Sequence, residues 1–360
     1  MSSTFGKNIK YSVFGQSHST AIGILIDGLP VGETIDETKI SDFMARRAPN
    51  NMPWSTPRKE KDAVEILSGV FNGKTCGAPL CAIIKNTDQK PKDYEKNKDI
   101  PRPSHGDFPG HIKFKGFEDF RGGGHFSGRL TAPLCIAGAI AKSILAQRGI
   151  FIGAHIDSIC GVKDKPFDPV NITKEELDYV SHAEFPVNRY NIGETMIAKI
   201  NLAKEKGDAL GGIIEGCAIG LPIGLGEPMF NGMENALAQA AFGIPAVRGV
   251  EFGLGFDASL KKASEHNDEY IIENNQIKTK TNNHGGIIGG ITTGMPLIMR
   301  IAIKPTPSIG QEQQSVNLKT NTMEKLIIEG RHDPCIVPRA VPILEAIMAM
   351  TILDFIVERK

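Results

Sequence analysis

The stretch AVPILEAIMAMTILDFIVERK, residues 340–360, presents apolar side chains on nearly every side of a helix until its charged end. The stretch GRLTAPLCIAGAIAKSILAQ, residues 128–147, has the same character. A helix that is apolar all round has no polar face for water, so it is buried in the interior. We therefore expect these two helices inside the protein and sheets outside them, the reverse of a sheet enclosed by helices.

Shorter segments around these helices have the patterns of strands and further helices. Apolar runs bounded by Gly or Pro predict strands at 21–29, 63–71, 211–221 and 296–304. Helices are expected at 36–47, 173–183 and 233–242. The predicted fold class is α/β (α+β): a single large domain over residues 1–360, with buried helices sandwiched between antiparallel sheets.

Two sequence patterns occur twice in the same order. GLPVG (28–32) returns as GLPIG (220–224), and ILSGVFNGKTCGAPL (66–80) resembles IIGGITTGMPL (287–297). Because repeated order favours duplication over chance, we predict similar halves at 1–105 and 195–305, related by a pseudo-twofold axis. Convergent turn chemistry is the alternative. The polar segment 85–103 is expected to form a mobile loop.

The composition is that of an ordinary soluble protein and disfavours several classes. Lys and Arg number 41, as do Asp and Glu, so no basic excess indicates a nucleic-acid or membrane partner. The six cysteines form neither a C-x-x-C pair nor a zinc-ligand pattern. The first ten residues are polar, and no apolar run reaches the about 18 residues of a membrane span. A reduced, cytoplasmic protein is the expectation.

The arginines gather in stretches where a ligand site is expected. Nine of them lie in or beside segments rich in Gly, Pro or His, at positions 46, 47, 58, 102, 121, 129, 248, 331 and 339. A guanidinium group presents a fixed fork of donors that fits carboxylate and phosphate. The set indicates a small anionic ligand, whereas ordinary surface ion pairing is the alternative for any single arginine.

Four histidines lie in loop-like stretches: His18 in FGQSHST, His105 in RPSHGDF, His125 in RGGGHFSGR and His332 in GRHDP. Imidazole suits proton transfer near neutral pH, and a purely structural histidine is the alternative. The three glycines of RGGGHFSGR permit positive φ and a nest of N–H groups for an anion; a tight turn with nothing bound is the alternative. The segment KPTPS (304–308) offers two hydroxyl groups for a phosphate, or merely turns the chain.

Several well-defined motifs are absent from the sequence. There is no G-x-x-x-x-G-K-[ST], no G-x-G-x-x-G after a strand, no H-E-x-x-H and no G-x-S-x-G, which disfavours nucleotide kinases, Rossmann dehydrogenases and α/β-hydrolases. One function that stays open is a metal-dependent phosphohydrolase with the possible ligands His105, Asp107, His111 and Asp333. Another is a non-enzymatic anion- or RNA-binding protein, which neutral charge and few aromatic residues disfavour.

The motifs resemble those of the chorismate synthase family from end to end. They are FGQSHSTAIGILIDGLPVG, RRAP, STPRKEKDAVEILSGVFNGKTCGAPL, RPSHGDF, FRGGGHFSGRLTA, GIPAVRGVEFGLGF, NNHGGIIGGITTGMPL, KPTPS and GRHDPCIVPRAVPILEA, in the order of the family. The resemblance implies a 1,4-elimination that converts 5-enolpyruvylshikimate 3-phosphate to chorismate and phosphate. It also implies a requirement for reduced FMN without net redox change.

The resemblance implies three catalytic residues. His18 would supply a proton to the departing phosphate, and His105 would favour or protonate the reduced flavin. Asp333 would relay a proton from flavin N5, while Arg331 clamps charge and Pro334 keeps the loop from running straight into the following helix. The alternative for Asp333 is a cap at the entry of that helix.

The resemblance also implies binding residues and partners. Substrate charges would meet Arg46, Arg47, Arg58, Arg129 and Arg339. FMN contacts would come from His125, Phe126, Ser127, Pro245, Ala246, Gly289, Lys304, Pro305, Thr306, Pro307, Ser308 and Arg331. No metal ion is implied, and family members resemble homotetramers. We find no nicotinamide-dinucleotide features at NNMPW (50–54), so an external flavin reductase is expected.

Overall fold

The computed structural model describes residues 3–49, 52, 54–55, 62–87, 95, 97–328 and 333–358. Its N-terminal part forms a five-stranded antiparallel sheet with the order β1-β2-β3-β7-β4. The strands are β1 Thr4–Phe5, β2 Lys10–Gly15, β3 Ala21–Asp27, β4 Val64–Ser68 and β7 Leu80–Lys85. A row of isoleucines on β3 faces inward, so this sheet has one buried and one wetter face.

A second five-stranded antiparallel sheet has the order β11-β16-β10-β8-β9. Its strands are β8 Phe151–Ile159, β9 Val162–Lys163, β10 Gly212–Ile219, β11 Val247–Phe252 and β16 Leu297–Ile303. Strand β8 is buried along almost its whole length, because helices cover both faces of this sheet.

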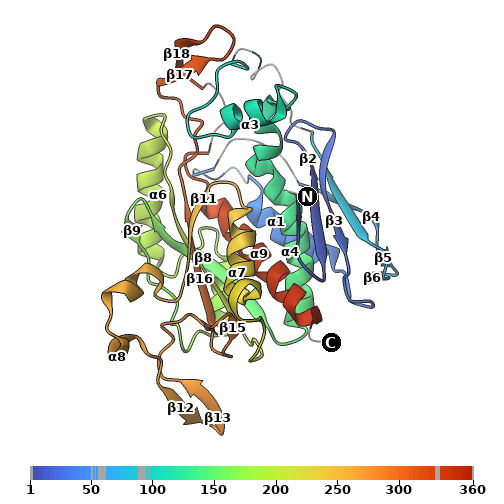
Figure 1. Ribbon diagram of the computed structural model, residues 1–360, viewed down its shortest axis with the longest axis vertical. Coiled ribbons are helices and arrows are strands. Elements are labelled where there is room, and N and C mark those ends of the chain that lie inside the picture. The colour runs from blue at the N-terminus through green and yellow to red at the C-terminus, as the bar shows by residue number, and fades with distance from the viewer. Residues whose placement is uncertain are drawn as a thin grey trace.

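The helices α4 Thr131–Ala146 and α9 Val337–Glu358 lie between the two sheets (Figure 1). Helix α1 Glu37–Arg47 packs against both of them, and α7 Met233–Phe242 packs against α9 and β11. Helix α4 packs along α9, and it also contacts β3 and β7 of the first sheet, while α9 contacts β8 and β10 of the second. Gly138 of α4 permits this close crossing, since a Cβ there would lie 2.1 Å from the Cβ of Ala346. The prediction of buried helices between antiparallel sheets is confirmed.

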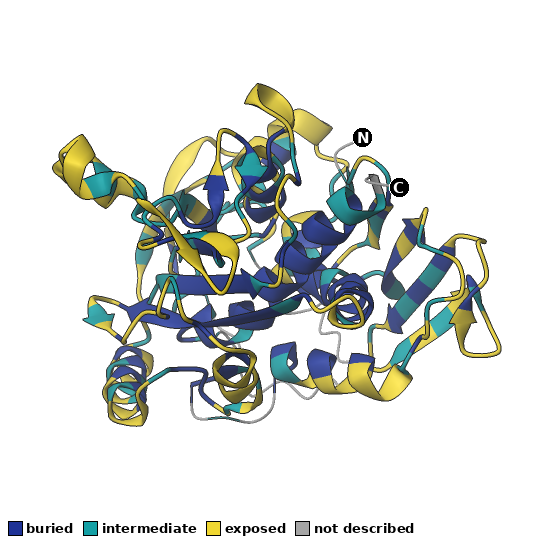
Figure 2. Ribbon diagram, turned by 90° about the horizontal axis from the view of Figure 1, so that it is seen from below, coloured by how far each residue is buried: buried dark blue, intermediate teal, exposed yellow. Residues whose placement is uncertain are grey.

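An outer helical layer covers the far face of the second sheet. Helix α5 Lys174–His182 packs on β8, and α6 Tyr190–Glu205 packs on β9. Figure 2 shows the resulting gradient, with buried residues along the second sheet and the central helices, and exposed residues on the outer helices and hairpins. The order of layers is therefore helix, sheet, helix, sheet.

Smaller elements connect these layers. Helical pieces are α3 Asp107–Phe114, η1 Arg121–Phe126, η2 Gly128–Leu130, η3 Met229–Asn231, η4 Gly255–Leu260 and α8 Ala263–His266. Two-stranded hairpins pair β5 Val70–Phe71 with β6 Lys74–Thr75, β12 Tyr270–Glu273 with β13 Gln276–Thr279, β14 Ile287–Ile288 with β15 Ile291–Thr292, and β17 Gln313–Asn317 with β18 Thr322–Leu326.

The repeated GLPVG and GLPIG segments make the same hydrogen bonds. The hydroxyl of Thr75 donates to the carbonyl of Pro30 (2.6 Å), and that of Thr292 donates to the carbonyl of Pro222 (2.7 Å). In both copies, the amides two and three residues after the proline donate back to this threonine. The strand orders β2-β3-β7-β4 and β8-β10-β16-β11 also correspond. These features are consistent with duplication, and the pseudo-twofold relation stays a prediction.

Each strand and helix expected from the sequence is present, with ends shifted by a few residues. The helix expected from 340 begins at Val337, and the strand expected at 63–71 divides into β4 and β5. The sequence patterns missed several elements, among them β2, β7 and β11. They also missed β8, whose FIGAHIDSI interrupts its apolar residues with His155 and Asp157, and α6, which has a glycine at position 193. Most of the polar loop expected at 85–103 lies outside the described residues or in irregular structure.

Two helical segments are long and apolar enough to cross a membrane by length and composition alone, Gly128–Ala146 and Val337–Val357. Their most apolar windows are 78% and 83% buried inside the protein, where they form the central layer. We therefore assign both to the core. All six cysteines are free thiols in the structure, and burial raises the pKa of Cys135 and of Cys335 to about 12.

Candidate functional site

A cavity of about 400 Å³ lies where the end of α1 and the starts of α4 and α9 meet the loops around 102–106, 244–246 and 304–308. The predicted site residues in its wall are Arg47, His105, Phe126, Ser127, Arg129, Pro245, Ala246, Lys304, Thr306, Pro307, Ser308, Asp333 and Arg339. They come from segments as much as 292 positions apart, such as Arg47 and Arg339, which the central helices bring together. This is the candidate active site.

Positive charge is concentrated in this cavity although the whole chain is neutral. Its described wall contains four arginines or lysines besides Arg47, namely Arg102, Arg129, Lys304 and Arg339, against the single carboxylate of Asp333. Burial lowers the pKa of Lys304, with a smaller contribution from Arg248. A cavity lined by this many cations is suited to a small anion.

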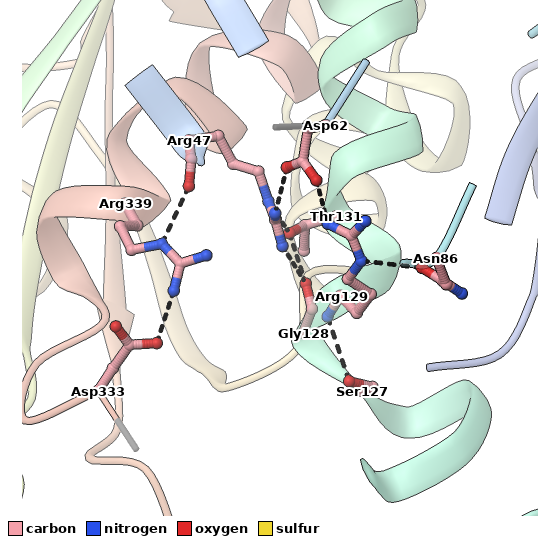
Figure 3. A network of polar contacts seen from close by, with 9 residues as sticks. All are labelled: Arg47, Asp62, Asn86, Ser127, Gly128, Arg129, Thr131, Asp333 and Arg339. Atoms are coloured by element: carbon pink, nitrogen blue, oxygen red, sulfur yellow. Dashed lines mark hydrogen bonds and ion pairs between the residues drawn. The ribbon is translucent and has the colours of Figure 1, made fainter. Parts of the chain in front are cut away.

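Two of these arginines share one buried carboxylate (Figure 3). Asp62 accepts a hydrogen bond of 2.9 Å from Nη1 of Arg47 and another from Nη1 of Arg129. Arg47 also donates to the hydroxyl of Thr131 (3.2 Å) and to the carbonyl of Gly128 (3.1 Å). Burial alone would raise the pKa of Asp62, but the two guanidinium groups lower it below its ordinary value. Both arginines are therefore held in a fixed orientation.

A third arginine connects α9 to the end of α1. Arg339 donates from Nε to the backbone carbonyl of Arg47 (2.9 Å) and from Nη1 to Oδ2 of Asp333 (2.6 Å), as Figure 3 shows. Asp333 lies four residues before the first residue of α9, and its carboxylate is turned to Arg339. The interpretation of Asp333 as a helix cap is therefore not supported.

His105 belongs to a second polar cluster, which lies at the N-terminal end of α3. Its Nδ1 lies 2.6 Å from Oδ1 of Asp107, and Arg102 donates to both oxygens of the same carboxylate at 2.7 and 2.8 Å. Arg102 also reaches the hydroxyl of Ser308 (3.3 Å). Burial would raise the pKa of Asp107, but hydrogen bonds from Arg102 and His105 lower it well below its usual range.

The triple glycine brings the backbone against two of the predicted histidines. Gly122, Gly123 and Gly124 all have positive φ, at 59°, 83° and 53°. A Cβ at Gly122 would lie 2.6 Å from Cε1 of His18, and one at Gly123 would lie 3.0 Å from Cε1 of His105. The glycines therefore let one loop separate the two imidazole rings. His18 is buried, at 7% exposure, and it does not line the described cavity.

The loop after β16 carries further predicted residues to this site. The hydroxyl of Thr306 donates to the backbone carbonyl of Asp333 (3.2 Å), and the ammonium group of Lys304 donates to the carbonyl of Ser104. The KPTPS segment is thereby joined to the loop before α9 and to the His105 loop. Its two prolines have no backbone N–H that would need a hydrogen-bond acceptor, which suits an irregular segment beside a cavity.

Comparison with known proteins identifies the family. Residues 9–357 match the family model described as "Chorismate synthase". The chorismate synthase of Pyrococcus abyssi is 44% identical over 356 residues, covering 99% of this chain and 98% of that protein. The chorismate synthase of Lancefieldella parvula is 43% identical over 365 residues, covering 98% of this chain and 96% of that protein.

The chain belongs to the chorismate synthase family. A crystal structure of a chorismate synthase superposes with a TM-score of 0.76 at 29% identity, covering 98% of this chain and 93% of that one. The chain is accordingly a lyase of the shikimate pathway, and its activity is the elimination that forms chorismate for aromatic biosynthesis. The expected family and reaction are confirmed.

Some residues expected from the family resemblance lie away from the cavity. Arg46 turns to the opposite side of α1, where it is paired with the buried carboxylate of Glu345 (2.6 Å) and lines a separate cavity of about 740 Å³. That larger cavity contains none of the other described residues predicted for the site. His125 lies between the carbonyl of Gly15 and the hydroxyl of Ser3, at 2.9 Å from each.

Four further expectations fall elsewhere. Gly289 lies at the turn between β14 and β15, and Pro305 is adjacent to lining residues without lining the cavity itself. Arg58 and Arg331, like the neighbouring His332, lie outside the described residues. Sequence reasoning gave Asp62 no site role, and it counted Arg102 among the nine arginines that indicate an anionic ligand without assigning it a contact.

The donor set of the metal-dependent alternative is not assembled. His111 is paired with Glu118 (2.8 Å), while Asp107 is engaged by Arg102 and His105. Among the residues that the structure describes, no group of three or more His, Cys, Asp or Glu side chains is placed to hold a metal ion. The phosphohydrolase interpretation therefore has no structural support beyond individual residues, and the family assignment supersedes it.

Proposed function

We propose that this chain performs its elimination in the 400 Å³ cavity, on 5-enolpyruvylshikimate 3-phosphate, with reduced FMN bound beside the substrate. The single observation that carries this proposal is the cationic wall: five Arg or Lys side chains line it, against the carboxylate of Asp333 in the wall and those of Asp62 and Asp107 behind it. Substrate and cofactor together bring two phosphates and two carboxylates. A preorganised cationic cavity would stabilise that charge and the phosphate that departs.

Substrate anions would be bound by Arg47, Arg129 and Arg339. The first two are oriented by Asp62 and the third by Asp333, so little side-chain freedom remains to be lost on binding. Arg58 is proposed for the same task by resemblance. Arg46 is not carried forward as a substrate ligand, because it does not line this cavity; it pairs with Glu345 and lines the separate cavity.

The same wall offers a fit for a flavin. Phe126, Ile244, Pro245, Ile336 and Ile343 form an apolar face beside the cations, as an aromatic ring system with a phosphate tail requires. Lys304 and the hydroxyl groups of Thr306 and Ser308 would hold the phosphate. When bound, reduced FMN would supply electron density and an acid–base ring nitrogen without net redox change.

Three side chains are proposed for proton transfer. His18 would donate to the departing phosphate, His105 would hold a proton toward the flavin, and Asp333 would accept a proton during loss of the substrate hydrogen. His105 and Asp333 line the same cavity, which supports a shared task. His18 does not line the cavity but lies against Gly122, which does, and this supports a role at the edge of the site.

The remaining expectations concern the setting of the enzyme. We propose a cytoplasmic homotetramer that receives reduced flavin from a separate reductase and has no nucleic-acid or membrane partner. Sedimentation would test the assembly, because a monomer at micromolar concentration would refute it. An assay that starts from NADPH and oxidised FMN would test the reductase, since turnover without a second protein would show that the chain reduces its own flavin.

The residue roles are tested by an anaerobic assay with chemically reduced FMN, following both phosphate and chorismate. His18→Ala, His105→Ala and Asp333→Asn should each lower turnover by about 10²–10⁴-fold with FMN still bound. His182→Ala, at the exposed end of α5, is the matched histidine control and should retain activity. Near-normal turnover in all three site variants would reject the roles, and flavin-independent phosphate release without chorismate would restore the hydrolase.

A further inference from the structure

The carboxylate of Asp107 has no role in the proposed proton transfer, but it contacts His105, which does. Asp107 is the first residue of α3, and its Oδ1 lies 2.6 Å from Nδ1 of His105. The guanidinium group of Arg102 holds both oxygens of that carboxylate, at 2.7 and 2.8 Å, and the backbone amide of Arg102 adds a bond of 3.0 Å. The carboxylate is therefore fixed before it meets the imidazole.

The distances decide which nitrogen of His105 carries the proton. A contact of 2.6 Å between Nδ1 and a carboxylate oxygen requires a hydrogen between them, because two lone pairs at that distance repel. The competing donor is Nη2 of Arg102, which lies 3.1 Å from the same Nδ1. That nitrogen already has an acceptor in Oδ1 of Asp107, so it does not need the imidazole lone pair. Neutral His105 is therefore protonated at Nδ1.

The other side of the ring adjoins a residue that has no side chain. A Cβ at Gly123 would lie 3.1 Å from Nε2 of His105, so only glycine leaves that nitrogen free space. Arg102 is in turn bonded to Ser308 of the KPTPS segment, which fixes the cluster to the opposite wall of the cavity. Both His105 and Ser308 line that cavity.

We propose that Asp107, held by Arg102, is a positioning residue that keeps neutral His105 in the Nδ1–H tautomer, so that Nε2 is the atom that exchanges protons in the cavity. The inference rests on the proposed role of His105. Carboxylate–imidazole pairs elsewhere show the energetic principle, since the carboxylate sets tautomer and ring orientation without itself taking the proton. Hydrogen bonds from Arg102 and His105 keep Asp107 ionised, which suits this task.

The same helix offers a matched pair for comparison. Nδ1 of His111 lies 2.8 Å from Oε1 of Glu118, so this histidine also contacts a carboxylate. The pair does not line the cavity, and the His111 side chain is 42% exposed. Glu118→Gln therefore removes a similar contact near α3 and should leave turnover unchanged.

The test combines kinetics with nitrogen NMR on the full-length chain. In protein with ¹⁵N-labelled histidine, His105 should give the shifts of a protonated Nδ1 and an unprotonated Nε2, assigned by their loss in His105→Ala. Asp107→Asn should move these shifts toward the other tautomer or a mixture and lower kcat by about 10²-fold or more, with KM changed less than about threefold. Asp107→Glu should recover at least about tenfold of the lost kcat, because it keeps the charge.

A merely structural role for Asp107 at the start of α3 predicts loss of helix stability with an unchanged His105 tautomer, and that result would overturn the proposal. If Asp107→Asn fails to fold, Arg102→Lys is the second variant, because it keeps the charge but loses the fork, and the same tautomer shift is expected. Near-normal turnover of His105→Ala would reject the role of His105 itself. Impaired His105→Ala beside fully active Asp107→Asn would reject only the present inference.

Discussion

Replacing Gly138 of α4 by alanine tests the central helix crossing. An added Cβ would lie 2.1 Å from the Cβ and 2.4 Å from the Cα of Ala346, whereas carbon atoms in contact are about 3.5–4.0 Å apart. The helices would have to separate by more than about 1 Å. Overpacking typically costs about 1–3 kcal/mol, and a contact with backbone belongs at the upper end. The better helix propensity of alanine offsets about 1 kcal/mol, so we expect a net loss of about 2 kcal/mol.

The measurement is urea denaturation followed by circular dichroism, with Gly138→Ala compared to the unaltered chain. Ala346→Gly in the same chain removes the 2.1 Å contact but leaves the one with Cα, so the double variant should recover only part of the difference. A Gly138→Ala chain more stable by about 1 kcal/mol would refute the reasoning, because helix propensity alone predicts that result.

Two further predictions concern buried charges. Glu345→Gln should lower the free energy of unfolding by about 3–5 kcal/mol, because the cations Arg46 and Lys142 lose their shared carboxylate; an unchanged denaturation midpoint would contradict this. Burial opposes ionisation of Glu345, but the two cations lower its pKa to about 2, so its contribution is complete above about pH 4.5 and is lost as the pH falls through about 2. Burial acts to lower the pKa of His155, but two neighbouring carboxylates raise it to about 9. Its stabilisation is therefore complete below about pH 6.5 and is lost as the pH rises through 9, a slope in denaturation midpoint that His155→Gln should abolish.

The main architectural prediction could be made from sequence because the residues of a helix themselves show whether it has a polar face for solvent. The two stretches at 128–147 and 340–360 lack a polar face, which no later packing can provide. Strand β8 was not predicted, because its burial depends on residues from other segments. His155 is compensated by Asp164 and Glu215, which come from other segments, so a polar residue in a fully buried strand cannot be interpreted from the strand alone.

Much of the candidate site was also accessible from sequence. His105, Asp333 and most of the predicted cofactor residues line one cavity, as the family motifs implied. Asp62 was not predicted, because its segment is rich in charged residues and carries no local sign of burial. Only the fold shows that this carboxylate lies between two arginines from distant parts of the chain.

The two neighbouring arginines of α1 separate what the sequence by itself determined from what required tertiary structure. The sequence determined that Arg46 and Arg47 end an amphipathic helix and add to a set of cations suited to anions. Consecutive residues on a helix point about 100° apart, and here they line different cavities. Arg46 turns to Glu345 and Arg47 to Asp62. Which of them lines the candidate site was decided by the packing of α1 against α4 and α9, because that packing places a different carboxylate and a different cavity beside each arginine.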